Sequence, residues 1–421
     1  MLVEFRAKNF RSIKEEIVLS LTASKHKELE KNCFESASLK LLKSSAIYGP
    51  NASGKSNILK ALSAMKKIVL LSASKFTEGT HIPLTPFLFS SQYIDKPTEF
   101  EITFIRKGIR YQFGFVADKK RVYEEWLFVF ETNRAQTWYT REYIPEKDDY
   151  AWYFGSKFKG EKNLWKNSTR SNALFLSTAV QLNSEQLKPV FNWFLNKLQI
   201  VGVFGWSPEF TIDLLQKDKY KDKIIRFLKI ADFDIEDVNV KFDDFSPDKL
   251  PKDLPLELKE KMIEEFGGKK IIEEFNTVHL NDEGEKVLLD FNEESDGTQK
   301  FFSILGPCLD TLDNGNVLFV DELNDNLHPL LVEFIVKLFH NEKMNRKGAQ
   351  IIFTTHETSI LSQSIFRRDQ VWFCEKEKQA TKLYSLLEFK PRKGVEDIEK
   401  GYLSGRYGAL PYIKSLYGVL D

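Results

Sequence analysis

The sequence contains little cysteine, no excess of either charge and no long hydrophobic run. Its three cysteines stand far apart in a chain of 421 residues and form no C-x-x-C pair: Cys33, Cys308 and Cys374. This pattern excludes a disulfide framework and a zinc site of the usual spacing. It favours small buried thiols in a reducing compartment.

Charge and hydropathy exclude two further classes of protein. Acidic and basic residues balance at 61 each, so no global field draws the chain to nucleic acid or to a membrane, although a local basic patch stays open. No segment approaches the roughly 20 apolar residues of a membrane span. The opening MLVEFRAKNFRSIKEE is too charged for a signal peptide. We expect a cytoplasmic protein without a membrane partner.

A glycine-rich loop, GPNASGKS, occupies residues 49–56. The apolar run before it predicts a buried strand, and helical spacing after it predicts a helix, which is the context of a phosphate-binding loop. Lys55 would reach the β- and γ-phosphates, and the Ser56 hydroxyl would hold Mg²⁺. The alternative is a Gly/Ser turn with a surface lysine. The expected nucleotide-binding residues are Gly49, Pro50, Asn51, Ala52, Ser53, Gly54, Lys55, Ser56 and Asn57.

A second apolar run, NVLFVDE at 316–322, ends in two carboxylates. Asp321 would hold Mg²⁺ through water, and Glu322 would act as the general base on the attacking water. Taken alone, the run could equally be a buried strand that ends at a polar edge. Far along the chain from Lys55, it is the expected partner of the P-loop, and this long gap argues against small GTPases and simple kinases.

Two further segments complete the set of motifs. AQIIFTTHE at 349–357 places His356 at a strand tip, where it can sense a γ-phosphate or be a satisfied strand-end histidine. ESDGTQKFFSILG at 294–306 places Ser295 and Gly297 before an apolar helix, where they form either an anion cradle or a simple helix cap. The complete order of the motifs is a more specific signal than any one of them. Along the chain they follow as P-loop, S-D-G-T-Q-K, Asp-Glu, N-D-N-L-H-P and T-T-H.

The organisation of the chain favours an α/β fold built around the P-loop strand. Alternating patterns predict strands in the first 25 residues and at 97–131, and helical spacing dominates from about 170. No internal repeat, low-complexity tract or sustained heptad pattern occurs. We expect an N-terminal ATPase lobe with the P-loop (1–134), a mostly helical insertion (135–270) and a C-terminal lobe with the remaining motifs (271–421).

This ordered set resembles the ABC-type ATPases of the SMC and OLD group. The resemblance implies a P-loop NTPase fold of the ABC/SMC-like head type, with ATP and Mg²⁺ as cofactors. It also implies a homodimer in which Ser295 and Gly297 of one subunit contact the γ-phosphate on the other. The signature departs from the transporter pattern L-S-G-G-Q. AKNFRSIKE resembles the N-terminal strand of SMC-like heads, which implies that Arg11 contacts the nucleotide.

A closer resemblance is to bacterial RloA/AbiLi-type ATPases, with similar heads in PtuA-type retron and Septu ATPases. Eight segments carry it: FRSI, GPNASGKSN, TRSNALFLSTAVQLN, SDGTQK, DELNDNLHP, FTTHE, RRDQVWFCEK and YLSGRYGALP. It implies an ATPase of an anti-phage, abortive-infection system. Such an ATPase would act as a dimer switch on a partner effector, such as an RloB-like protein or a nuclease subunit.

Two alternatives stay open. An OLD-like nuclease would need metal ligands near the C-terminus, where Glu375 and Glu377 lie in a charged turn between two predicted strands. A DNA-binding, SMC-like repair ATPase would use basic stretches with aromatic residues, as at 157–170 and 217–229, which could equally be solvated faces. Arg406 is either a partner contact or part of a structural turn.

Overall fold

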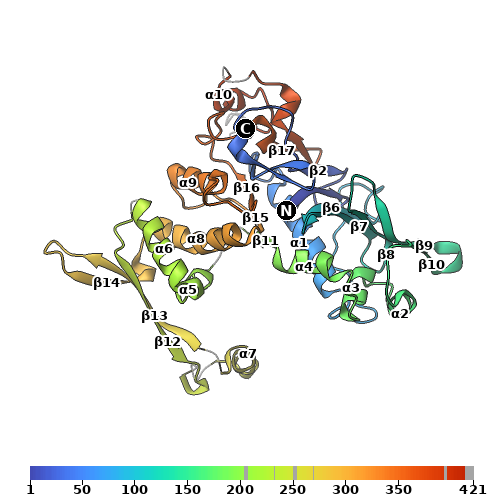
Figure 1. Cartoon of the computed structure of the whole chain (residues 1–421), viewed down its shortest axis with the longest axis horizontal. Coiled ribbons are helices and arrows are strands. Elements are labelled where there is room, and N and C mark those ends of the chain that lie inside the picture. Colours follow the sequence, from blue (N-terminus) through green and yellow to red (C-terminus); the bar gives the residue numbers. More distant parts are fainter. Residues whose placement is uncertain (203–206, 232, 250–253, 269, 393–395, 413–421) are drawn as a thin grey trace, which may run out of the picture. The chain divides into compact units, whose positions relative to one another are not determined.

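The computed structural model describes residues 1–202, 207–231, 233–249, 254–268, 270–392 and 396–412 (Figure 1). These residues form two compact units. The first joins Met1–Gly205 to Cys308–Asp421, and the second comprises Trp206–Pro307. No helix in the described part of the chain is long and apolar enough to cross a membrane.

A six-stranded sheet in the first unit carries the predicted motifs. Five strands run parallel and the edge strand β18 is antiparallel to β17. Three of the parallel strands, β5, β15 and β16, are buried along their whole length, which explains their continuous apolar runs. The order is β11 (Leu198–Val201), β15 (Val317–Val320), β16 (Gln350–Thr355), β5 (Ser44–Tyr48), β17 (Val371–Glu377) and β18 (Ala380–Ser385). The P-loop strand therefore lies in one sheet with the apolar runs that precede Asp321 and His356.

A seven-stranded antiparallel sheet forms the other layer of the first unit. Its order is β10 (Asp149–Phe154), β9 (Gln136–Ile144), β8 (Val122–Phe130), β7 (Ile109–Ala117), β6 (Thr98–Arg106), β1 (Leu2–Lys8) and β2 (Ile17–Ser20). The predicted strands in the first 25 residues and at 97–131 are therefore confirmed. Buried residues alternate with more exposed ones along β6, as expected for a sheet with one face on the core.

Six α-helices, four 3₁₀ helices and a small hairpin complete the described part of the first unit. Apolar residues of α1, among them Ile58, Leu62 and Met65, join one large core with residues of both sheets. The α-helices are α1 (Lys55–Leu71), α2 (Lys162–Asn167), α3 (Phe175–Gln181), α4 (Lys188–Asn196), α9 (Pro329–His340) and α10 (Ile398–Leu403). The remaining elements are η1 (Glu30–Asn32), β3 (Cys33–Ser36), β4 (Leu39–Leu42), η2 (Pro145–Lys147), η5 (Arg368–Gln370) and η6 (Leu386–Phe389).

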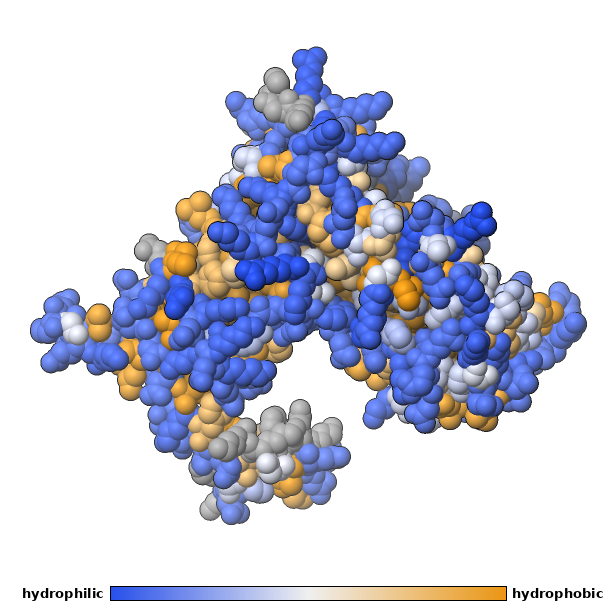
Figure 2. All heavy atoms as spheres, in the orientation of Figure 1, coloured by the Kyte–Doolittle hydropathy of each residue, from blue (hydrophilic) through white to orange (hydrophobic). Residues whose placement is uncertain are grey.

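The second unit combines helices with a three-stranded antiparallel sheet. Phe275, Phe291 and Phe302 pack together with ring centroids 4.3 to 5.2 Å apart. Apolar spheres also lie along its β13–β14 hairpin in Figure 2, where Leu280 and Leu288 are exposed. Its elements are α5 (Glu209–Leu215), α6 (Asp218–Ile230), β12 (Asp237–Asp244), η3 (Pro247–Lys249), α7 (Leu256–Phe266), β13 (Lys270–Leu280), β14 (Lys286–Asp290), η4 (Phe291–Glu293) and the start of α8 (Asp296–Asn314).

The structure divides the chain at other points than the expected 134/135 and 270/271. Strands β9 and β10 continue the antiparallel sheet beyond residue 134, because Trp138 and Tyr139 bury their rings in the core of that sheet. Helices dominate only from α2 onward. The second unit begins near residue 206 and ends within α8, so the S-D-G-T-Q-K segment lies in it.

Candidate functional site

The P-loop connects the carboxyl end of β5 to the first turn of α1. Gly54 has φ 109°, a conformation that favours glycine, and a Cβ there would lie 1.9 Å from the Thr381 Oγ1 atom. A Cβ on Gly49 would lie 2.1 Å from the carbonyl oxygen of Cys374. Both glycines are therefore required by the close approach of the loop to β17 and β18.

The loop presents free donors of the kind that phosphate oxygens need. Among the described residues, no protein acceptor lies within hydrogen-bond distance of the backbone N–H groups of Gly54, Lys55 and Ser56. The buried Ser53 hydroxyl also has no partner. Free N–H groups at the start of a 17-residue helix form an anion cradle. The donor set therefore fits a nucleotide phosphate.

Lys55 lies inside the loop and is buried. Its Nζ atom donates to the carbonyl oxygens of Gly49 at 2.6 Å and Pro50 at 3.1 Å. Burial lowers the pKa of Lys55, and the negative charges of Glu322 and Asp321 are among the groups that oppose this shift. The two carboxylates thus face the lysine across the carboxyl edge of the sheet.

Thr354 fixes the two carboxylate residues that follow β15. Its hydroxyl donates to Asp321 Oδ1 at 2.7 Å and accepts from the backbone N–H of Glu322, also at 2.7 Å. Asp321 is buried, whereas Glu322 is half-buried and has φ 52°. A left-handed backbone at a glutamate is strained, and such strain concentrates at functional sites. The sequence pattern predicted Asp321 and Glu322 but gave no sign of Thr354.

His356 follows β16 and is exposed at the same edge. Its Nε2 atom lies 3.0 Å from Nδ2 of Asn324, and Oδ1 of Asn324 accepts from the Thr355 hydroxyl at 2.8 Å. An amide nitrogen donates, so the imidazole accepts at Nε2 and carries its proton at Nδ1. The N-D-N-L-H-P segment is thereby connected to the His356 strand.

The turn that contains Arg11 rests on the P-loop. Asn57 Nδ2 donates to Ser12 Oγ at 2.6 Å, and Ser12 Oγ lies 2.7 Å from Thr381 Oγ1. Thr381 Oγ1 in turn donates to the carbonyl oxygen of Ser53 at 3.0 Å. These bonds place the exposed residue Arg11 directly beside the start of α1. Ser12 and Thr381 were not foreseen, because a lone serine or threonine carries no pattern.

Ser295 and Gly297 lie in the second unit, at the start of α8. The Ser295 hydroxyl accepts from the backbone N–H of Thr298 at 3.1 Å and lies 2.8 Å from its side-chain oxygen. Ser295 therefore caps the helix and is exposed. Within one chain, the structure gathers the P-loop, Asp321, Glu322, His356 and the Arg11 turn.

The TRSNALFLSTAVQLN segment supports the loop that follows α1. Arg170 Nη2 donates to the carbonyl oxygens of Ala73 and Phe76, and Asn172 Nδ2 donates to those of Thr77 and Thr80. These contacts are structural and lie within the first unit. They assign the segment a role that the resemblance alone did not specify.

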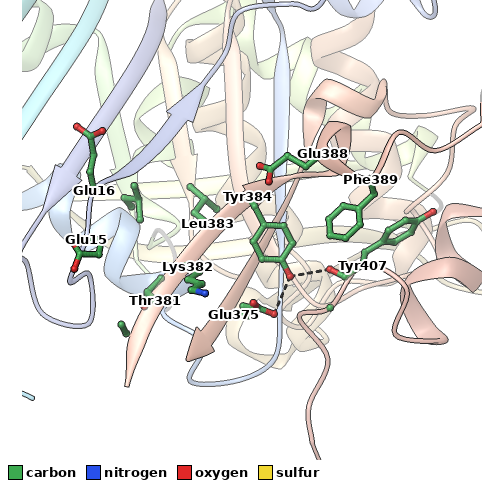
Figure 3. A pocket seen from close by; sticks show the side chains of 13 residues that line it. Glu15, Glu16, Glu375, Thr381, Lys382, Leu383, Tyr384, Glu388, Phe389 and Tyr407 are labelled. Carbon is green, nitrogen blue, oxygen red and sulfur yellow. Dashed lines mark hydrogen bonds between the residues drawn. The ribbon is translucent and has the colours of Figure 1, made fainter. Parts of the chain in front are cut away.

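A pocket of about 560 Å³ opens beside the P-loop, on the other side of Thr381 (Figure 3). Tyr384, Phe389 and Tyr407 form one wall, and Glu15 and Glu16 lie opposite. Glu375 and Glu388 also line it, so it would repel phosphate groups. The P-loop side of Thr381 therefore suits phosphate groups better than this pocket does.

Residues singled out for the alternative functions make contacts within the chain. Glu375 accepts from the Tyr384 hydroxyl at 3.0 Å, Glu377 pairs with Lys382, and Arg406 pairs with Glu396 at 2.8 Å. No group of three metal-ligating side chains occurs among the residues that the structure describes. In the basic stretches, Lys157 pairs with Glu131, Lys221 with Asp237 and Lys229 with Glu236.

Comparison with known proteins agrees with this geometry. A family model described as "AAA domain, putative AbiEii toxin, Type IV TA system" matches residues 44–362, well over half of the chain. The match begins at β5, directly before the P-loop, and extends beyond His356. No curated protein matches the chain.

Solved structures align over most of the chain at low similarity. The SMC head domain from Thermotoga maritima covers 91% of this chain and 98% of its own, with 14% identity and a TM-score of 0.37. The recombination mediator protein RecF with ATP covers 91% and 99%, with 13% identity and a TM-score of 0.33. CbiO1 of Clostridium perfringens, part of the cbiONQ ABC transporter complex, covers 96% of both, with 11% identity and a TM-score of 0.33.

At such scores these alignments add no argument of their own, and the assignment rests on the family match and on the motifs in their places. The predicted α/β P-loop NTPase fold is confirmed by the parallel sheet and the family match, and the ABC/SMC-like head type stays a prediction. It belongs to the P-loop ATPase family described as "AAA domain, putative AbiEii toxin, Type IV TA system".

Proposed function

We propose that the chain binds ATP with Mg²⁺ at the carboxyl edge of its parallel sheet and hydrolyses it. One observation carries this proposal: Thr354 holds both Asp321 and Glu322 at the edge where Lys55 also lies. Charged groups of opposite sign, preorganised at one sheet edge next to a free anion cradle, are what phosphoryl transfer needs.

Each residue at this edge has a role that follows from its position. The N–H groups of Gly54, Lys55 and Ser56 would bind phosphate oxygens, and the ammonium group of Lys55 would leave the loop carbonyls for the β- and γ-phosphates. The Ser56 hydroxyl would hold Mg²⁺ directly and Asp321 would hold it through water, and the bound ion would neutralise charge on the phosphates. Arg11 would add a contact from the turn that Ser12 anchors.

Glu322 is the proposed general base. Its backbone is held by Thr354, so its carboxylate can accept a proton from a water that attacks the γ-phosphate. The Nδ1–H group of His356 would donate to an oxygen of the γ-phosphate, because Asn324 occupies the Nε2 atom and thereby fixes the tautomer. Binding or loss of the γ-phosphate at His356 would thereby alter the hydrogen bond to Asn324 in the N-D-N-L-H-P segment.

The site would be completed by a second copy of the chain. Ser295 and Gly297 start α8 in a unit separate from the P-loop, and the exposed N-terminal turn of a 19-residue helix suits an anion. ATP held between the P-loop of one copy and this turn of the other would join the two copies. ADP lacks the γ-phosphate and would release them. The first unit would thus supply the P-loop contacts, and the second unit of the other copy would supply the turn at Ser295 and Gly297.

The cellular role that the sequence resemblance supports is an anti-phage, abortive-infection ATPase of the RloA/AbiLi type. The description of the matching family, with its toxin and toxin–antitoxin terms, is consistent with this role. In this role, the ATP-dependent dimer would control a protein effector, such as an RloB-like or nuclease subunit.

Light scattering of the Glu322→Gln variant tests the dimer. With the base removed, ATP–Mg²⁺ should raise the mass from one chain to two, whereas ADP should not. Glu322→Gln combined with Ser295→Arg is the control, because the bulky cation at the α8 turn should block the contact while ATP binding persists. A mass that is the same with and without ATP contradicts the switch.

A further inference from the structure

A second pocket of the first unit lies at the opposite edge of the parallel sheet. Its volume is about 350 Å³. Lys197, Gly315 and Lys347 line it, and they lie one to three residues before strands β11, β15 and β16. The nucleotide site lies at the carboxyl ends of β15 and β16. The two sites are therefore separated by the length of these strands, roughly 13 to 20 Å.

The charges around this pocket are all positive. Arg106, Lys107, Lys197 and Lys347 line it, and its lining contains no aspartate or glutamate. Burial lowers the pKa of Lys197, and repulsion from Arg106 and Lys347 lowers it further. The negative charge of the nearby Asp310 opposes this shift of the Lys197 pKa. The Asp310 carboxylate accepts hydrogen bonds from Gln199 and Asn316.

Arg106 is the most unusual of these residues. Its Nε and Nη1 atoms are buried and have no hydrogen-bond partner in the described part of the chain. The two-residue turn Lys107–Gly108, with φ 50° and 77°, joins β6 to β7 and holds Arg106 in place opposite Ile109. A guanidinium that is partly withdrawn from water without a partner costs folding free energy, so its retention needs an explanation.

A neutral donor accompanies the cations. Trp193 is fully buried at 0% exposure, lines the pocket, and has no acceptor for its Nε1–H among the described residues. Its ring stacks on Phe104 with centroids 4.3 Å apart, which fixes its orientation. Lys197 is also held, because its Nζ atom donates to the carbonyl oxygen of Asn314 at 2.7 Å. Stacking therefore fixes the side chain of Trp193, and a hydrogen bond fixes that of Lys197.

We propose that this pocket binds a phosphate-type oxyanion, with Arg106 as its principal ligand. A guanidinium can donate two parallel hydrogen bonds to such a group, and the indole N–H of Trp193 can add a third. Lys107, Lys197 and Lys347 would balance the remaining negative charge. The same chemistry accepts a free phosphate or a phosphate in a single-stranded polynucleotide.

Titration calorimetry with the full-length Lys55→Ala protein tests the site apart from the nucleotide site. One arm uses inorganic phosphate in chloride buffer, and the other uses a ten-nucleotide single-stranded DNA. Binding in at least one arm is expected, and Arg106→Gln should weaken it roughly ten- to hundredfold, as for a lost charge-assisted hydrogen bond. Which arm binds identifies the source of the phosphate.

Arg110→Gln is the matched control. It removes the same charge four residues along the chain, where the guanidinium stacks 4.0 Å from the centroid of the Phe130 ring, and it should leave binding unchanged. If Arg106→Gln does not fold, Lys347→Gln at an exposed position should still weaken binding. No binding in either arm would overturn the proposal, and so would equal binding by the Arg106 and Arg110 variants.

Discussion

The two edges of the parallel sheet differ in whether their positive charges face negative ones. At the carboxyl edge, Lys55 faces Asp321 and Glu322, and Thr354 hydrogen-bonds to both acidic residues. At the amino edge, Arg106 and Lys347 face no carboxylate in the lining of their pocket. Both edges belong to the same strands and share one core.

This difference indicates what each edge can bind. The carboxyl edge holds cationic and anionic groups together, so it can accept a phosphate chain and a divalent cation at once. The lining of the amino-edge pocket carries only positive charge, and Arg106 and Trp193 keep unpaired donors there, so an anion alone would satisfy it. Local compensation of charge, and not the net charge of zero, distinguishes the two sites.

Two variants probe this contrast, Thr354→Val at the carboxyl edge and His340→Gln at the amino edge. Thr354→Val should have the larger effect. Valine keeps the shape of threonine but removes the hydroxyl that orients Asp321 and Glu322. Groups that orient metal ligands are typically worth 10- to 100-fold in activity or metal affinity. We expect a loss of ATP turnover of about that size and a raised Mg²⁺ requirement, measured by phosphate release against Mg²⁺ concentration.

Thr355→Val is the matched control for this prediction. Thr355 is equally buried on the same strand, but its hydroxyl donates to Asn324 rather than to Asp321. It should leave the Mg²⁺ requirement of the enzyme unchanged. Equal Mg²⁺ profiles for the two valine variants would show that Thr354 does not orient the carboxylates.

A smaller effect is expected at the amino edge, where His340 is buried beside the start of β5. Burial lowers the pKa of His340 to about 3, and the charges of Lys43 and Lys31 add to the shift. Its Nε2 atom lies 2.7 Å from the Ser44 hydroxyl. Because the folded pKa lies below the unfolded value, stability from the neutral imidazole is complete above pH 6.5 and is lost as the pH falls towards 3.

His340→Gln keeps an acceptor but cannot be protonated in this range. The free energy of unfolding of the wild type should therefore fall between pH 6.5 and 5 by about 2 kcal/mol more than that of the variant. Urea denaturation at several pH values measures this difference. His81→Gln, at an exposed position, is the control and should follow the wild type. Parallel pH profiles for wild type and His340→Gln would contradict the account.

The sequence predicted the position of a residue in the fold wherever that position depends on a local pattern. The P-loop, the Asp-Glu strand and the Thr-Thr-His strand could each be located, because an apolar run followed by polar residues marks the carboxyl end of a buried strand. The parallel register then places Gly49, Asp321 and His356 at one edge.

The remaining features depend on contacts between distant segments. Thr381 meets Gly54 and Ser12 only because β18 packs beside the P-loop, and no spacing in the sequence signals this contact. The sequence did not predict that β9 and β10 extend the sheet past residue 134, because charged residues such as Arg141 obscure the alternating pattern. Arg141 is buried and pairs with Glu125. The amino-edge pocket joins residues from six separate segments.

Phosphate release by wild type and Glu322→Gln at saturating ATP–Mg²⁺ tests the central claim most directly. The wild type should release phosphate, and the variant should bind ATP with similar affinity but release phosphate at least about a hundredfold more slowly. Glu333→Gln, which removes a carboxylate that pairs with Lys337 on α9, should match the wild type. Equal rates for Glu322→Gln and wild type, or no release by the wild type, would contradict ATP hydrolysis at this edge.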